Sequence, residues 1–103
     1  MAKIFYSDFC KHCINFYLIR PDITEFNNEP DRLNWLCAKE VIEELDEKDF
    51  ENIKLIYGSL RDGNRFRAAV DAITEGKEPE TTRLWRLCRL IEKKIAKKRG
   101  LIG

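Results

Sequence analysis

Five basic residues near the C-terminus recur at a spacing that places them on one face of a helix. They are Arg83, Arg86, Arg89, Lys93 and Lys97. Because an α-helix turns once every 3.6 residues, steps of three and four form one continuous stripe. Arginine can fork onto guanine edges or phosphates, and lysine neutralises phosphate charge. The stripe therefore predicts a surface that contacts duplex DNA.

Two threonines, Thr81 and Thr82, stand at the start of the same predicted helix. Hydroxyls and free backbone amides at a helix N-terminus suit a phosphate oxygen, so both residues join the predicted DNA surface. The other interpretation is a solvated face, with Lys and Arg enriched at the helix C-terminus to complement the macrodipole. That interpretation accounts for residues 97–99 but not for Arg83 and Arg86, which lie in the first turns.

Charge is distributed unevenly along the chain. Residues 83–99 hold eight Lys or Arg and the single acid Glu92, which makes the segment +7. The whole chain carries +1, so the remainder carries −6, and residues 40–51 hold seven acids against Lys48. Such polarity indicates a negatively charged partner for one end of the molecule. We interpret the acidic run as a solvated helix face, with nucleic-acid mimicry or cation binding as alternatives.

The segment Cys10-Lys11-His12-Cys13 raises the question of a metal or redox site, because C-x-x-C is the commonest half of a zinc site. The other half is missing, since Cys37 and Cys88 are isolated in the sequence. Both Cys10 and Cys13 fall on an apolar helical stripe, and buried cysteine behaves as a small hydrophobe. We therefore expect free, buried thiols, an exposed His12, and neither metal nor cofactor, with zinc binding and redox chemistry as the alternatives.

Enzyme chemistry has little support in this sequence. The chain contains one histidine, no glycine-rich phosphate loop and no Ser or Cys arranged with His. Its two tryptophans, Trp35 and Trp85, are expected in the core or in an interface rather than as base-stacking platforms. We predict a protein that is not an enzyme.

Helical elements must position these residues. Apolar residues follow the 3.6-residue period in five stretches, and the sequence predicts one all-α domain over residues 1–103. Asn28 and Asp46 are predicted N-caps, Gly100 a Schellman C-cap, and Phe26 an anchor for the loop before the second helix. The five predicted helices form a compact bundle and span residues 4–20, 29–45, 47–58, 64–75 and 79–99.

The last two predicted helices have the proportions of a helix-turn-helix. A short helix, a tight turn over residues 76–79 and a longer basic helix would place the second helix in the major groove by its N-terminal residues. Thr82, however, occupies a position where such motifs usually bury an aliphatic side chain.

No apolar run approaches the roughly 20 residues that span a bilayer, and no signal-peptide core follows Met1, so we expect a cytoplasmic protein without a membrane partner.

From Asn34-Trp35 onward the chain resembles small phage-type and mobile-element regulators of low-GC Gram-positive bacteria, which resemble the promoter-reading region 4 of sigma factors. The likeness covers about two thirds of the chain. Leu45-Asp46-Glu47-Lys48-Asp49-Phe50, followed by Ile56-Tyr57, is similar to the opening helix of that domain, and residues 85–100 to its recognition helix. The ending Lys93-Lys94-Ile95-Ala96-Lys97-Lys98-Arg99-Gly100-Leu101-Ile102 also matches. The resemblance implies transcription control through duplex DNA, with RNA polymerase as a further partner.

Together these features predict a DNA-binding transcriptional regulator. The competing hypothesis is a small protein-interaction module or inhibitor that does not bind DNA. It would dock through the acidic surface of the second and third helices or through the aromatic N-terminal helix. A homodimer is a further expectation, because helix-turn-helix proteins often read two half-sites. The N-terminal helix is a candidate for the dimer surface and equally a candidate for the core.

Overall fold

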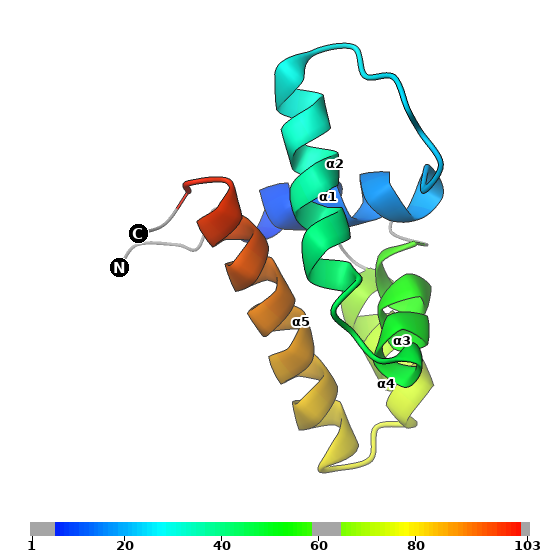
Figure 1. Cartoon of the computed structure of the whole chain (residues 1–103). Coiled ribbons are helices and arrows are strands. Elements are labelled where there is room, and N and C mark those ends of the chain that lie inside the picture. The colour runs from blue at the N-terminus through cyan, green and yellow to red at the C-terminus, as the bar shows by residue number, and fades with distance from the viewer. Residues whose placement is uncertain (1–5, 59–64, 102–103) are drawn as a thin grey trace.

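The computed structural model describes residues 6–58 and 65–101, with side chains for residues 9–58 and 68–101. All regular secondary structure in this part of the chain is α-helical, so the predicted all-α class is confirmed (Figure 1). The predicted helix ends at residues 4–5 and 64, and the side chain of Phe66, lie outside what is described. The helices are α1 (Tyr6–Ile19), α2 (Glu29–Ile42), α3 (Glu47–Tyr57), α4 (Arg65–Thr74) and α5 (Glu80–Lys98).

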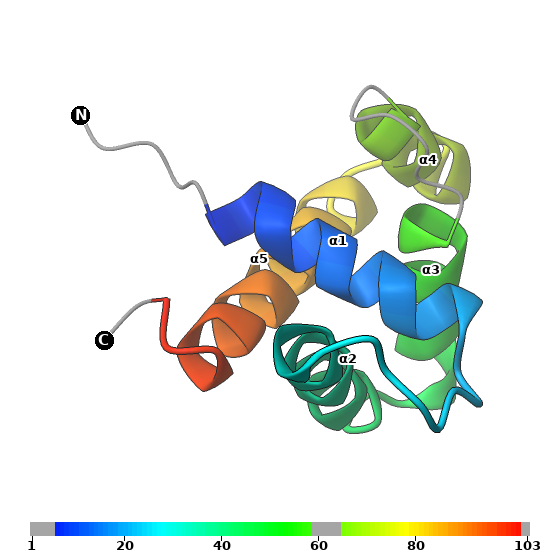
Figure 2. The same cartoon turned by 90° about the horizontal axis from the view of Figure 1, so that it is seen from above.

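Helix α1 lies at the centre of the fold. It crosses behind α2 and α5 in Figure 1, and from above it extends from α5 to α3 (Figure 2). Its buried face carries Cys10, Cys13 and Ile14, each without solvent exposure. The apolar period of this segment therefore marks the main core helix, which packs against three others.

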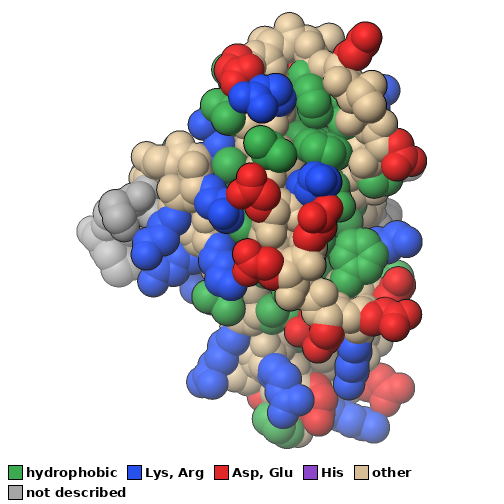
Figure 3. All heavy atoms as spheres, in the orientation of Figure 1, with side chains coloured by type: hydrophobic (Ala, Val, Ile, Leu, Met, Phe, Trp, Pro, Cys, Tyr) green, Lys and Arg blue, Asp and Glu red, His purple; other side chains and the backbone are tan. Residues whose placement is uncertain are grey.

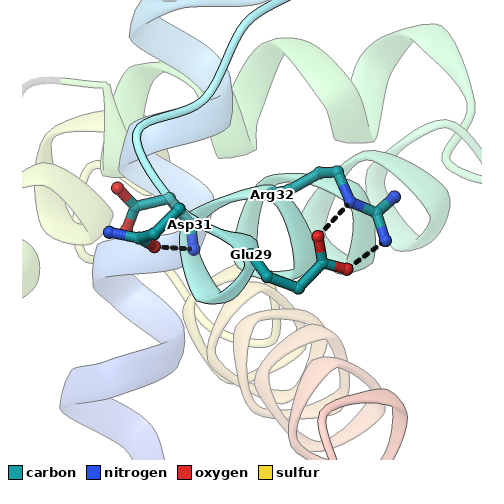
Figure 4. Close-up of polar contacts among 4 residues, drawn as sticks. Glu29, Asp31 and Arg32 are labelled. Atoms are coloured by element: carbon teal, nitrogen blue, oxygen red, sulfur yellow. Dashed lines mark hydrogen bonds and ion pairs between the residues drawn. The ribbon is translucent and has the colours of Figure 1, made fainter.

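The start of α2 follows from its local sequence. Asn28 Oδ1 accepts a hydrogen bond from the amide of Asp31 at 2.8 Å, while Glu29 and Arg32 form an ion pair one turn apart (Figure 4). Pro30 lies in the first turn, where its missing N–H costs nothing. The predicted cap is confirmed. The helix ends at Ile42 rather than at residue 45, because the amides of Glu44 and Leu45 bond to carbonyls only three residues back.

The turn after α2 leads directly into α3. Asp46 Oδ1 accepts from the amide of Asp49 at 2.8 Å, which confirms the second predicted N-cap. Helix α3 packs on α1 and α4, and α4 packs on α5. Ile53, Ile56 and Val70 are fully buried at these contacts, so all five described helices share one core.

Two helix ends place a residue in the left-handed region. Gly100 has φ +76°, and the amides of Gly100 and Leu101 bond to the carbonyls of Lys97 and Ala96. This is the predicted Schellman cap of α5. At the end of α4 the left-handed residues are Glu75, with φ 55°, and Gly76, with φ 69°, and the chain then enters the turn to α5.

Aromatic side chains hold the long loop between α1 and α2 against the core. The Phe26 ring lies 6.3 Å from Phe16 and 5.5 Å from Trp35, so the predicted anchor is confirmed. Trp35 is 9% exposed, and its indole N–H donates to the carbonyl of Arg20 at 2.9 Å. Trp35 is therefore a core residue, as the sequence predicted.

Candidate nucleic-acid interface

Helix α5 has a buried side and a fully solvated side. Its buried side carries Leu84, Cys88, Ile91 and Ile95, none more than 5% exposed. In Figure 3, Lys and Arg gather over α5 at the left and lower side of the view, with Asp and Glu beside them over α2 and α3. The predicted basic stripe is exposed along its whole length, at Arg83, Arg86, Arg89, Lys93 and Lys97.

The basic residues of α5 divide into a paired and an unpaired set. Lys98 Nζ lies 3.0 Å from Glu40 Oε2, and Lys94 Nζ lies 3.7 Å from Glu44 Oε2. No residue of the exposed stripe forms an ion pair with another described residue. The acidic run of residues 40–51 therefore supplies ion-pair partners for one side of α5. The stripe, which lies opposite the apolar side of the helix, has no such partner among the described residues.

Arg99 also belongs to the structural set. Its Nε donates to Asn34 Oδ1 at 2.7 Å, and its guanidinium carbon lies 5.8 Å from the centre of the Phe9 ring. Asn34 is 8% exposed, so the hydrogen bond satisfies a buried amide oxygen. This arginine fastens the end of α5 to α2 and α1, a role that no sequence pattern indicated.

The two threonines at the start of α5 use their hydroxyls within the protein. Thr81 Oγ1 donates to the carbonyl of Lys77 at 2.9 Å and lies 2.8 Å from Thr74 Oγ1 at the end of α4. Thr82, which is exposed, donates its hydroxyl to the Glu78 carboxylate. Both hydroxyls thus hold the turn between α4 and α5. Their predicted contact with phosphate stays a prediction, and it would have to exchange for these bonds.

A groove opens beside the first turns of α5. It has a volume of about 750 Å³ and lies between α3, the end of α4 and α5. Its apolar lining comes from Ile73 on α4 and from Leu84, Leu87 and Leu90 on α5. Leu84 is 5% exposed, whereas Leu90 is 49% exposed. A groove of this kind depends on how far α3 and α5 diverge, which helical periodicity does not report.

The cysteines are packing residues in this fold. All four are buried, and burial raises the pKa of the thiols of Cys10, Cys13 and Cys88 to about 12. At neutral pH these thiols are protonated and poor nucleophiles. His12 is exposed, as predicted. Within residues 6–58 and 65–101 no three His, Cys, Asp or Glu side chains gather in a group that could hold a metal ion.

A buried polar pair lies between α3 and α5. The Tyr57 hydroxyl donates to Glu92 Oε2 at 2.5 Å, and both side chains are nearly inaccessible to solvent. Burial, together with nearby Cys88 and Glu92, raises the pKa of Tyr57, so the phenol stays protonated. The pair joins positions 35 residues apart, and the sequence offered no signal for it.

Comparison of the chain with protein-family models, curated proteins and solved structures finds no significant match to any of them. No helix in the described ranges is long and apolar enough to cross a membrane. The function is therefore argued from the surface of α5 and its surroundings.

Proposed function

We propose that this protein is a DNA-binding transcriptional regulator that reads duplex DNA with the exposed face of α5. The observation that carries the proposal is the division of basic residues on this helix. Lys94 and Lys98 face acids of the same molecule, whereas the exposed stripe has no acidic partner among the described residues. A continuous, unneutralised basic face is what a phosphate backbone attracts.

The placement of α5 supports docking by its N-terminal half. The turn over residues 75–79 and the first turn of α5 form the lower end of the molecule in Figure 1, away from α2. A helix-turn-helix presents the first residues of its second helix to base edges in this way. In this proposal α4 and α5 are the helix-turn-helix. The resemblance to sigma region 4 adds RNA polymerase as a second partner.

The stripe divides into two roles along the helix. Arg83, Arg86 and Arg89 occupy the first three turns, where a guanidinium can fork onto guanine or phosphate. Lys93 and Lys97 continue the same face and would neutralise phosphates farther along the groove. Thr81 and Thr82 complete the surface at the helix N-terminus.

The competing hypothesis, a protein-interaction module without DNA binding, has less support. The aromatic residues of α1 that it would use lie in contacts within the fold, since Tyr17 packs on Trp35 at 5.4 Å and Phe16 on Phe26. The acidic surface that it would use is partly paired with lysines of α5.

Fluorescence anisotropy of a labelled duplex tests the DNA proposal. Wild-type protein should bind with a log–log salt slope of roughly −3 to −5, as four to six phosphate contacts give. Arg83→Gln/Arg86→Gln should weaken binding by about 1 to 3 kcal/mol per lost arginine contact. The matched control is Lys94→Gln/Lys98→Gln, which removes the same charge from the paired side of the helix and should leave binding nearly unchanged.

A second pair separates base contacts from phosphate contacts. Lys93→Gln/Lys97→Gln should reduce the salt slope by roughly 2, since two phosphate contacts are lost. Absence of binding by the wild type would overturn the proposal. Equal losses in the Arg83/Arg86 pair and its Lys94/Lys98 control would do the same, because bulk charge alone would then account for binding.

A further inference from the structure

The groove beside α5 is unusual because it combines an apolar floor with oppositely charged walls. Ile73, Leu84 and Leu87 line it, and Leu90 stands at its edge with 49% of its surface exposed. Exposed leucine adjoining an open apolar groove is stabilised when a partner covers both. The groove is therefore a docking surface whose occupant must supply an apolar side chain and matching charges.

The walls of the groove carry opposite net charge. On α3 the lining residues are Asp46, Lys48 and Asp49, which sum to −1, and on α5 they are Glu80, Arg83 and Arg86, which sum to +1. Glu75 adds a further acid at the end of α4. A different protein would match these walls only if it carried acidic groups opposite α5 and basic groups opposite α3. A second copy of this chain carries both kinds of group.

Two-fold symmetry turns this arrangement into a self-complementary surface. In an isologous contact both copies use the same surface patch. When one residue of the first copy contacts a second residue of the other copy, the reverse contact forms as well. When the two-fold axis runs along the groove, the α5 wall of one copy faces the α3 wall of the other, with basic residues against acidic ones. Leu90 at the edge of each groove provides the apolar side chain for the opposite groove.

We propose that the groove between α3, α4 and α5 binds a second copy of this chain, with Leu90 of each copy inserted into the groove of the other. The N-terminal helix, the surface that sequence reasoning considered for dimers, is instead the centre of the core. The proposal goes beyond the DNA proposal and does not depend on it. Because Arg83 and Arg86 belong to both surfaces, pairing and DNA binding through these arginines exclude one another.

Sedimentation or light scattering over a range of protein concentrations, without DNA, tests the proposal. Wild-type protein should approach twice the 12.2 kDa chain mass as concentration rises. Leu90→Glu should stay monomeric, with helicity retained because the residue is half exposed. Leu55→Glu is the matched control, since Leu55 is 59% exposed and does not line the groove. This variant should associate as the wild type does.

A charge-exchange experiment defines the orientation. Asp49→Arg and Arg86→Glu should each weaken self-association on the order of tenfold, because like charges then face one another across the two-fold axis. Mixing the two variants should restore association, since both contacts between positions 49 and 86 again join opposite charges in the mixed dimer. Thermal unfolding of each variant confirms that the monomer remains folded.

Three outcomes would overturn the proposal. They are a wild type that stays monomeric at all concentrations, a Leu90→Glu variant that associates like Leu55→Glu, and a mixture that gains nothing over its separate components. Asp49→Arg alters a residue outside the proposed DNA stripe, so a loss of self-association in this variant does not depend on DNA binding. A monomeric wild type that binds duplex would leave the DNA proposal standing.

Discussion

The two halves of α5 use the same residue types for different purposes. In the C-terminal half, Lys94, Lys98 and Arg99 contact Glu44, Glu40 and Asn34 and fasten the helix to α2. In the N-terminal half, the exposed arginines have no acidic partner among the described residues, and an open groove runs along one side. Charge along the sequence therefore overstates the free positive surface. The acidic residues packed beside α5 determine which of its basic side chains form ion pairs within the protein.

The largest expected effect is a difference in stability between a substitution in the packed half of α5 and one beside its open groove. Ile95→Ala removes a side chain with no solvent exposure and should lower the free energy of unfolding by about 2 to 5 kcal/mol. Leu90→Ala, at a half-exposed position of the same helix, should cost less than about 1 kcal/mol in the monomer. Urea unfolding of both variants at low protein concentration measures the difference. Similar losses would mean that the two halves are equally packed.

Alkaline pH should weaken the packed region through its thiols. Folding raises the pKa of Cys10, Cys13 and Cys88 from an ordinary value near 9 to about 12. Between these values the unfolded chain has lost protons that the folded chain retains. Stability is therefore intact below pH 9 and falls as pH rises above it, by up to about 1.4 kcal/mol per thiol and pH unit.

Urea unfolding at pH 8 and pH 10 measures this fall. Cys10→Ala serves as the control, because removing one buried thiol should make the dependence on pH shallower. An unfolding free energy that is the same at both pH values would contradict the assignment of protonated thiols to the core. So would rapid reaction of the native thiols with a thiol reagent at neutral pH.

The smallest expected effect is the difference in stability between removing the lysines of α5 that form ion pairs and removing those that do not. Lys94→Ala/Lys98→Ala should destabilise the fold only slightly, because both ion pairs are solvent-exposed. Lys93→Ala/Lys97→Ala removes two like charges that have no partner among the described residues, so stability should be unchanged. Thermal unfolding at low and high salt checks both, and only the first pair of substitutions should remove a salt-sensitive contribution. A larger stability loss in the second pair would reverse the assignment.

Local features of this fold could be predicted because they depend on near neighbours. The caps at Asn28 and Asp46 and the left-handed Gly100 each involve hydrogen bonds over three to five residues. Helical periodicity likewise placed Cys10 and Cys13 in the core. The exposed face of α5 follows from the same rule, since a stripe opposite the apolar side must face solvent.

Long-range features could not be predicted in this way. The contact between Arg99 and Asn34 joins positions 65 residues apart, and that between Lys98 and Glu40 joins positions 58 apart. Both require the crossing of α2 and α5, which periodicity does not define. The hydroxyls of Thr81 and Thr82 are a different case, because their partners on the turn and on α4 lie only 4 to 7 residues away. Residue type suggested phosphate, whereas the fold supplied internal acceptors.

The attachment of α5 to α1 and α2 also sets the order in which the chain can fold during synthesis. Helix α5 is made after α1, α2, α3 and α4, yet it covers surfaces of the first two helices. Until residues 80–99 leave the ribosome, the face of α1 that packs on α5 lacks part of its packing. Apolar surface left open in this way favours association with other chains. A nascent chain that stops before α5 therefore exposes apolar surface that the folded chain buries.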